Sequence, residues 1–205
     1  MSKFAGALGA LALTALATSA HAATVVDATR IRLTTAGGVV LQVGELVALN
    51  FLGTNVALAT EGATATTNQI YSDVNGGANT GPQNANDGAL PYFRSYGDVP
   101  TFYHALNTSG FLDITFDAPA TLASLSVFGR TDCCSDRDVY NVEVFNASNV
   151  SIFSGQLDAR NDGHVGTIVF DRPTAAVPEP AAWALMIVGF GAAGAVVRRR
   201  KAALA

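Results

Sequence analysis

The sequence predicts an all-β domain, a β-sandwich or jelly roll, between two apolar terminal segments. Three observations predict it: alternating apolar and polar residues, β-branched and aromatic side chains in those stretches, and turn residues between them. In residues 29–35, for example, Ile31 and Leu33 alternate with Arg30 and Arg32. The expected strands are residues 29–35, 39–49, 111–116, 121–128, 139–145, 150–153 and 165–170.

Glycine, proline and asparagine mark the expected connections. Gly44 predicts a bulge within residues 39–49, and Asp117-Ala-Pro119 predicts a turn between two strands. Residues 72–110 are rich in glycine, asparagine and proline and predict a long irregular stretch. A loop of that length inside a compact domain usually has a function.

The first 22 residues predict a secretory signal peptide. Lys3 supplies the positive start, an Ala/Leu-rich apolar stretch follows, and Ala20-His21-Ala22 has the A-x-A form of a cleavage site. His21 is therefore expected to be removed. Residues 23–176 are then the mature body, and we expect it to lie outside the cytoplasm.

The end of the chain, residues 177–201, predicts a membrane-spanning segment. Residues 181–197 carry no charge, and a helix of that length spans roughly 25 Å. Trp183 suits a membrane interface, and the basic cluster at residues 198–201 suits the cytoplasmic side. A buried C-terminal helix of a soluble protein is the alternative, but it would be expected to have a polar face.

This tail resembles the PEP-CTERM sorting signal of Gram-negative bacteria. It has the form PEPxxWxxMIxGFG followed by arginines, with Pro178, Glu179 and Pro180 as the motif. The resemblance implies that an exosortase recognises the tail, cuts near the motif and releases or attaches the body beyond the inner membrane. The contact with the inner membrane would then be transient.

The charge of the body excludes one class of partner. Without the two terminal signals, the body holds seven basic and fifteen acidic residues, and it has no lysine. Nucleic acid would require a basic face, so we expect no nucleic-acid partner. The composition is that of a soluble extracellular domain.

Several segments of the body resemble the discoidin, or coagulation-factor C-type, domain. They are residues 55–68, 84–88, 102–116 and 126–146, and the run GRTDCCSDR is most similar to the fucolectin branch. The resemblance covers roughly residues 40–170. It implies an eight-stranded, galactose-binding-like jelly roll with ligand-binding loops at one end, and a lectin function.

Cys133 and Cys134 are the only cysteines of the chain. In an oxidising compartment two cysteines ordinarily pair. Adjacent Cα atoms are about 3.8 Å apart, below the usual disulfide range of about 4.4–6.8 Å, and such a bond closes almost no loop. It would form a rigid apolar knob instead of a fold-stabilising link. The alternative is two reduced cysteines in an ordinary turn.

The resemblance to fucolectins implies roles for residues around this pair. The disulfide would contact an apolar sugar face, while Arg130 and Arg137 would hold the sugar hydroxyls. The alternative is that these arginines pair with neighbouring aspartates. His104 would be a third sugar ligand, or else a packing residue.

The same resemblance implies calcium ligands at Asn84 and Asp87. Calcium takes six to eight oxygens, and Ala89 occupies a position where a further ligand is expected. The alternative for Asp87-Gly88 is a simple turn.

The sequence contains no catalytic motif, and we expect no enzyme activity. Two functions remain. One is an exported lectin-like module that binds carbohydrate, such as the exopolysaccharide of the cell. The other is a structural matrix or biofilm protein without a specific ligand.

Overall fold

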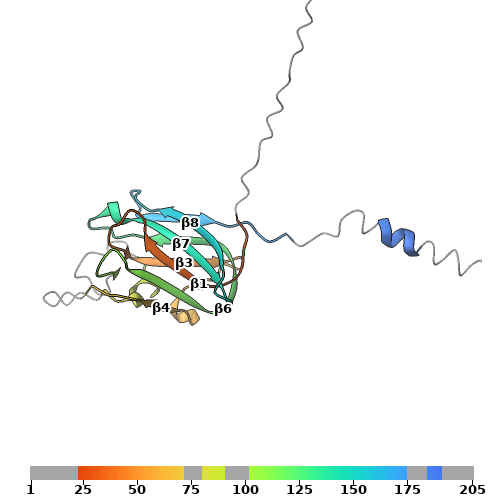
Figure 1. Ribbon diagram of the computed structural model, residues 1–205, viewed down its shortest axis with the longest axis horizontal. Coiled ribbons are helices and arrows are strands. Elements are labelled where there is room, and N and C mark those ends of the chain that lie inside the picture. Colours follow the sequence, from red (N-terminus) through yellow and green to blue (C-terminus); the bar gives the residue numbers. More distant parts are fainter. Residues whose placement is uncertain (1–22, 72–79, 91–101, 175–183, 191–205) are drawn as a thin grey trace, which may run out of the picture. The chain divides into compact units, whose positions relative to one another are not determined.

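A computed structural model of the protein describes residues 23–71, 80–90, 102–174 and 184–190, and the body within them is all-β (Figure 1). The strands are β1 (Val25–Thr35), β2 (Gln42–Val43), β3 (Glu45–Asn50), β4 (Thr64–Thr67), β5 (Tyr103–His104), β6 (Phe111–Phe128), β7 (Val139–Asn146), β8 (Ser151–Asp158) and β9 (Val165–Val169). Three single-turn 3-10 helices join them: η1 (Ala59–Glu61), η2 (Pro82–Ala85) and η3 (Ser135–Arg137).

The centre of the main sheet is β1, and its alternation agrees with the sequence. Ile31 and Leu33 are fully buried, whereas Arg30 and Arg32 lie on the outer face. The strand lies between β6 and β7, with Ile31 opposite Ile114 on one side and Val144 on the other. These three side chains are all buried, so the inner face of the sheet forms the apolar core.

A single long strand, β6, takes part in two sets of pairings. Its first part, around Leu112, pairs with β1 and β4, and its last part, around Leu125, pairs with β3 and β9. Both leucines are fully buried. The strand therefore joins the layer β4-β6-β1-β7-β8 to the layer β3-β6-β9, and their apolar sides enclose the core.

The turn expected at Asp117-Ala-Pro119 is wrong, because β6 continues through it. The ladder to β1 skips this segment: Thr115 is opposite Arg30, and the next paired residue, Ala120, is opposite Ala28. Pro119 thus lies in an irregularity where no backbone N–H has to be donated. The sequence signal of a turn marks a bend in one strand.

Other elements differ less from the expectation. The chain changes partners at Gly44, where a bulge was expected: β2 pairs with β5, and β3 pairs with β6. Strand β4 was missed because its sequence, Thr64–Thr67, has no apolar alternation. Strand β8 extends beyond the expected residue 153 to Asp158. Parts of the long stretch, residues 72–79 and 91–101, lie outside the described residues.

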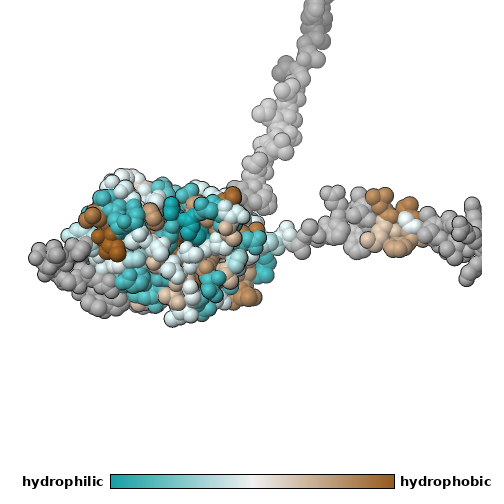
Figure 2. All heavy atoms as spheres, turned by 60° about the horizontal axis from the view of Figure 1, so that its bottom comes forward, coloured by the Kyte–Doolittle hydropathy of each residue, from teal (hydrophilic) through white to brown (hydrophobic). Residues whose placement is uncertain are grey.

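The described residues of the tail form a short helix. Residues 184–190 are helical and expose large apolar side chains, among them Leu185 and Phe190 (Figure 2). They belong to a second unit that begins at Arg172. Among the described residues, no helix is both long and apolar enough to cross a membrane. Of the expected membrane span at residues 181–197, the structure describes residues 184–190. The expected signal peptide and the motif at residues 178–180 lie outside the described ranges.

On the outer face of the sheet, two arginines of β1 share one carboxylate of β6. Arg30 Nη1 lies 2.9 Å from Asp113 Oδ2, and Arg32 donates from Nε and Nη2 to the same side chain at 2.8 and 2.6 Å. The guanidinium groups stack on Phe145 and Phe111, at 4.0 and 4.2 Å from the ring centroids. Asp113 is buried beneath them, so its charge depends on these partners.

We expect Asp113→Asn to lower the free energy of unfolding by about 2–4 kcal/mol, because two partly buried arginines lose their shared carboxylate. Urea denaturation of the secreted protein measures the change. Asp158→Asn is the matched control, since Asp158 pairs with Arg160 on an exposed loop, and it should change stability little. Equal effects of the two substitutions would contradict this account of the sheet face.

Candidate functional site

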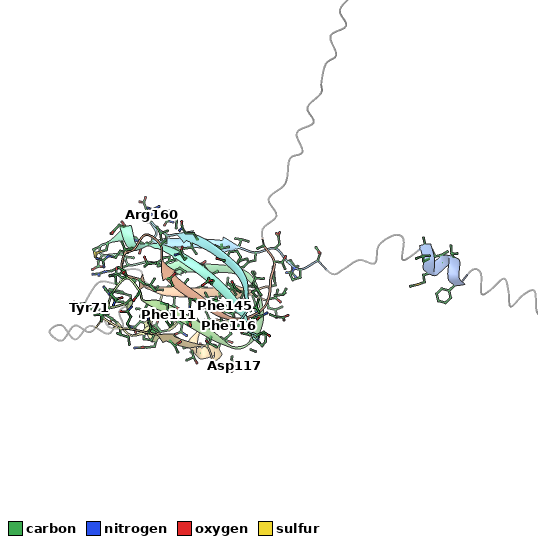
Figure 3. The ribbon with its side chains drawn as sticks, viewed as in Figure 1. Tyr71, Phe111, Phe116, Asp117, Phe145 and Arg160 are labelled. Carbon is green, nitrogen blue, oxygen red and sulfur yellow. A yellow bond between two sulfur atoms is a disulfide. The ribbon has the colours of Figure 1, made fainter. Side chains whose placement is uncertain are left out.

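The candidate site lies at the end of the body where β6 gives way to β7. The connecting residues 129–138 are held by the neighbouring loop after β8: Gly129 N–H donates to the His164 carbonyl at 2.7 Å, and Ala159 N–H donates to the Asp138 carbonyl at 2.7 Å. Arg160, from this loop after β8, and Tyr71, from another loop, lie at the same end of the body (Figure 3). Several loops therefore meet here.

Cys133 and Cys134 form a disulfide in this connection, with their Cα atoms 3.8 Å apart. Cys133 is exposed and Cys134 is half-buried. Cys134 adopts a left-handed backbone conformation, with φ of 65°, directly before η3. The chain therefore reverses at the disulfide and presents an apolar sulfur surface to solvent. We call this feature the disulfide knob.

Arg130 precedes the disulfide knob in the same connection and is only 8 % exposed. Its Nε and Nη2 both donate to the carboxylate of Asp132, the second at 2.7 Å. Its guanidinium lies 4.8 Å from the ring centroid of Phe102. Arg130 therefore pairs with a neighbouring aspartate, which was the alternative to sugar binding. This ion pair stabilises the loop.

Arg137 is placed differently from Arg130. It ends η3, is half-buried, and its side chain makes no hydrogen bond or ion pair with any residue that the structure describes. Its charge nevertheless acts on His104, whose pKa it lowers together with Arg130. The backbone N–H of Arg137 donates to the Cys134 carbonyl at 3.0 Å, so Arg137 and its planar donor group follow directly after the disulfide knob, within electrostatic range of His104.

His104 stands on β5 and is 8 % exposed. Its Nδ1 lies 2.6 Å from the Ala105 carbonyl, which assigns the proton to Nδ1 and leaves Nε2 as an acceptor. The ring packs beside Tyr71, with centroids 4.8 Å apart. Burial lowers the pKa of His104, and the charges of Arg137 and Arg130 lower it further, although the bond to Ala105 acts in the opposite direction. The histidine is therefore held neutral.

Asp138 is a fully buried carboxylate behind the loop, and it binds partners from three segments. His164 Nδ1 lies 2.9 Å from Oδ2, and the backbone N–H of Arg130 donates to the same carboxylate. The single proton of the Tyr140 hydroxyl is shared between Oδ1, at 3.2 Å, and the Gln42 carbonyl, at 2.9 Å. Burial raises the pKa of Asp138 in spite of these bonds. Asp138 is one of the aspartates near Arg130 and Arg137 in the sequence, but its side-chain partners are a histidine and a tyrosine and not an arginine.

Gln42 was not expected in the site, because it lies in a strand far earlier in the chain. It is opposite His104 in the β2–β5 pair and is fully buried. Its backbone carbonyl accepts the Tyr140 hydroxyl at 2.9 Å, but neither polar atom of its side-chain amide has a partner among the described residues. Buried amides of this kind are usually completed by water or another polar group.

The described residues do not complete a calcium site. Asn84 is buried in η2, and Asp87 Oδ1 accepts the Ala89 N–H at 2.8 Å, as in the turn alternative. Glu45, which was not predicted to lie near this segment, is fully buried in β3 and accepts the Gly88 N–H at 3.1 Å. No group of three or more histidine, cysteine, aspartate or glutamate side chains in the described ranges could hold a metal ion. Calcium binding therefore stays a prediction.

The lowered pKa of His104 predicts a loss of stability in mild acid. Between the unfolded pKa near 6.5 and the lower folded pKa, the unfolded chain binds a proton that the folded protein does not, so stability falls as pH falls through this window. Urea midpoints between about pH 7.5 and pH 5 measure the loss. His104→Gln should reduce it; an unchanged pH dependence in this variant would contradict the assignment.

Comparison with known proteins identifies a motif in the tail. Residues 176–201 match the PEP-CTERM protein-sorting motif. No curated protein and no solved structure matches the chain, so the resemblance of the body to the discoidin domain stays a prediction. The matched motif marks a protein for export across the membrane and for processing at its C-terminus. The chain is thus an exported, surface-associated protein with a PEP-CTERM sorting motif.

Proposed function

We propose that the body is a non-catalytic carbohydrate-binding module, displayed or released at the surface of a Gram-negative cell after an exosortase cuts the tail near Pro178. The observation that supports it best is an arginine that follows an exposed disulfide in the chain and has no polar partner among the described residues. Arg137 and the disulfide knob offer a polar fork and an apolar surface side by side. A pyranose ring has the matching surfaces, hydroxyl groups at its edge and C–H groups on its faces.

In this proposal the residues have separate tasks. The sulfur atoms of Cys133 and Cys134 contact an apolar face of the sugar, and Arg137 donates to two neighbouring hydroxyl oxygens. Neutral His104 offers Nε2 to a further hydroxyl. Arg130 is held by Asp132 and stabilises the loop. It contributes less to direct contact with the sugar than the resemblance to fucolectins implies.

The charge of the body narrows the class of glycan. The body has an excess of eight acidic residues, and Arg137 is the one cation proposed at the sugar. A strongly acidic polysaccharide would be repelled by the body as a whole. We therefore propose a neutral glycan, such as a neutral exopolysaccharide, as the ligand.

We expect Arg137→Ala to abolish or weaken glycan-array binding by about tenfold or more, because a charge-assisted pair of hydrogen bonds is lost. Arg160→Ala is the matched control: Arg160 lies at the same end of the body but is exposed and paired with Asp158. The control should bind like the unaltered protein.

The alternative, a matrix protein without a specific ligand, predicts a different result. The unaltered protein would then bind no glycan on the array, and Arg137→Ala would behave like it in biofilm assays.

The disulfide knob should also be required for binding. Reduction of the secreted protein, or the double substitution of Cys133 and Cys134 by serine, removes the sulfur surface and frees Cys134 from its left-handed conformation. We expect glycan binding to be lost while the urea midpoint changes little, since the bond closes almost no loop. Glycan binding that survives reduction, with free thiols verified by mass spectrometry, would contradict this role.

A further inference from the structure

A hollow of about 360 Å³ lies at the end of the body opposite the candidate site. It is formed where β6 bends and where the chain turns after β3, between residues 50–56 and 116–121. The bend and the loop after Phe128 are separated by eight residues of β6, or roughly 25 Å. Phe116 and Asp117 accordingly lie at the end of the body away from Tyr71 (Figure 3). The hollow is therefore distinct from the site at the disulfide knob.

The hollow combines an apolar floor with an acidic rim. Phe116, only 6 % exposed, and the half-buried Val56 belong to its floor. Glu61 and Asp117 line the rim and are exposed. A Cβ on Gly62 would lie 2.9 Å from Asp117 Cβ, so the residue after Glu61 passes directly against Asp117. Both acids therefore line the same hollow, and the Asp117 side chain packs against the residue that follows Glu61.

Neither carboxylate is neutralised by the part of the chain that the structure describes. Glu61 and Asp117 make no side-chain hydrogen bond or ion pair there, and no arginine or lysine is among the residues that line the hollow. Two neighbouring unpaired carboxylates favour a cation, and the apolar floor favours carbon beside that cation. The complementary ligand carries a positive group on an apolar framework.

We propose that this hollow binds an amino sugar with a free, protonated amine, such as a de-N-acetylated hexosamine unit of a polysaccharide. The ammonium group lies between Glu61 and Asp117, and the C–H face of the ring lies on Phe116. A volume of about 360 Å³ is in the range of small-ligand sites and admits a ring, whereas a linear amine leaves most of it unfilled. The inference goes beyond the proposed function and does not depend on Arg137.

The test is a titration of the processed protein, followed by two-dimensional 1H–15N NMR in slightly acidic buffer that keeps the amine protonated. Glucosamine is the probe, glucose and N-acetylglucosamine are neutral controls with the same ring, and cadaverine is a linear diamine. We expect glucosamine to shift the signals of residues 50–56 and 116–121, and the three controls to shift them much less.

Substitutions then separate the charge from the fold. Glu61→Gln and Asp117→Asn should each weaken glucosamine binding by about two- to fivefold, as expected for exposed ion pairs, and the double variant more. Asp162→Asn, an exposed acid at the other end of the body, should bind as before. The spectrum of each variant shows whether it is folded.

Four results would overturn the proposal: no shifts with glucosamine, equal shifts with the neutral sugars, equal binding of cadaverine, or full binding by the folded double variant. Arg137→Ala should leave the glucosamine shifts unchanged. A failure at the disulfide knob and a failure at this hollow are therefore distinguishable.

Discussion

The geometry of the candidate site depends on one buried carboxylate, that of Asp138. The carboxylate binds the ring of His164, the hydroxyl of Tyr140 and the backbone N–H of Arg130. The backbone carbonyl of Asp138 accepts the N–H of Ala159. Gly129 passes so close that a Cβ there would lie 2.3 Å from this carboxyl group. A buried carboxylate that is satisfied from several segments fixes all of them at once. The two ends of the loop that carries the disulfide knob are thereby held against the core.

The chain enters and leaves the body at one end of the main sheet. Asp171 N–H donates to the Ala23 carbonyl at 3.0 Å, so the chain enters and leaves the body side by side. Strand β9 (Val165–Val169) begins directly after His164, in the loop beside the candidate site, and ends directly before Phe170, next to this pair. The candidate site and the Ala23–Asp171 pair therefore lie at opposite ends of one strand.

Sequence patterns predicted the parts that depend on local chemistry. The alternation of Ile31 and Leu33 placed β1 with its correct face inward, and the PEP-CTERM form of the tail is confirmed by the family comparison. The turn predicted at Pro119 was wrong, because a proline inside a strand is tolerated at an irregularity of the ladder. That irregularity depends on the pairing with β1, which the local sequence does not show. The contributions of Gln42 and Glu45 were missed for a related reason: each lies in a short strand whose neighbours are set by tertiary pairing. No local signal distinguishes Arg130, which pairs with Asp132, from Arg137, which has no such partner in the described part of the chain.

The central claim is that the disulfide knob and Arg137 together form a sugar-binding surface. A crystal structure of the secreted, processed protein soaked with neutral monosaccharides tests it most directly. The account predicts an intact Cys133–Cys134 bond, with a sugar ring against the sulfur atoms and its hydroxyls within hydrogen-bond distance of Arg137. Free thiols at these positions, or sugar bound only elsewhere on the body, would contradict it.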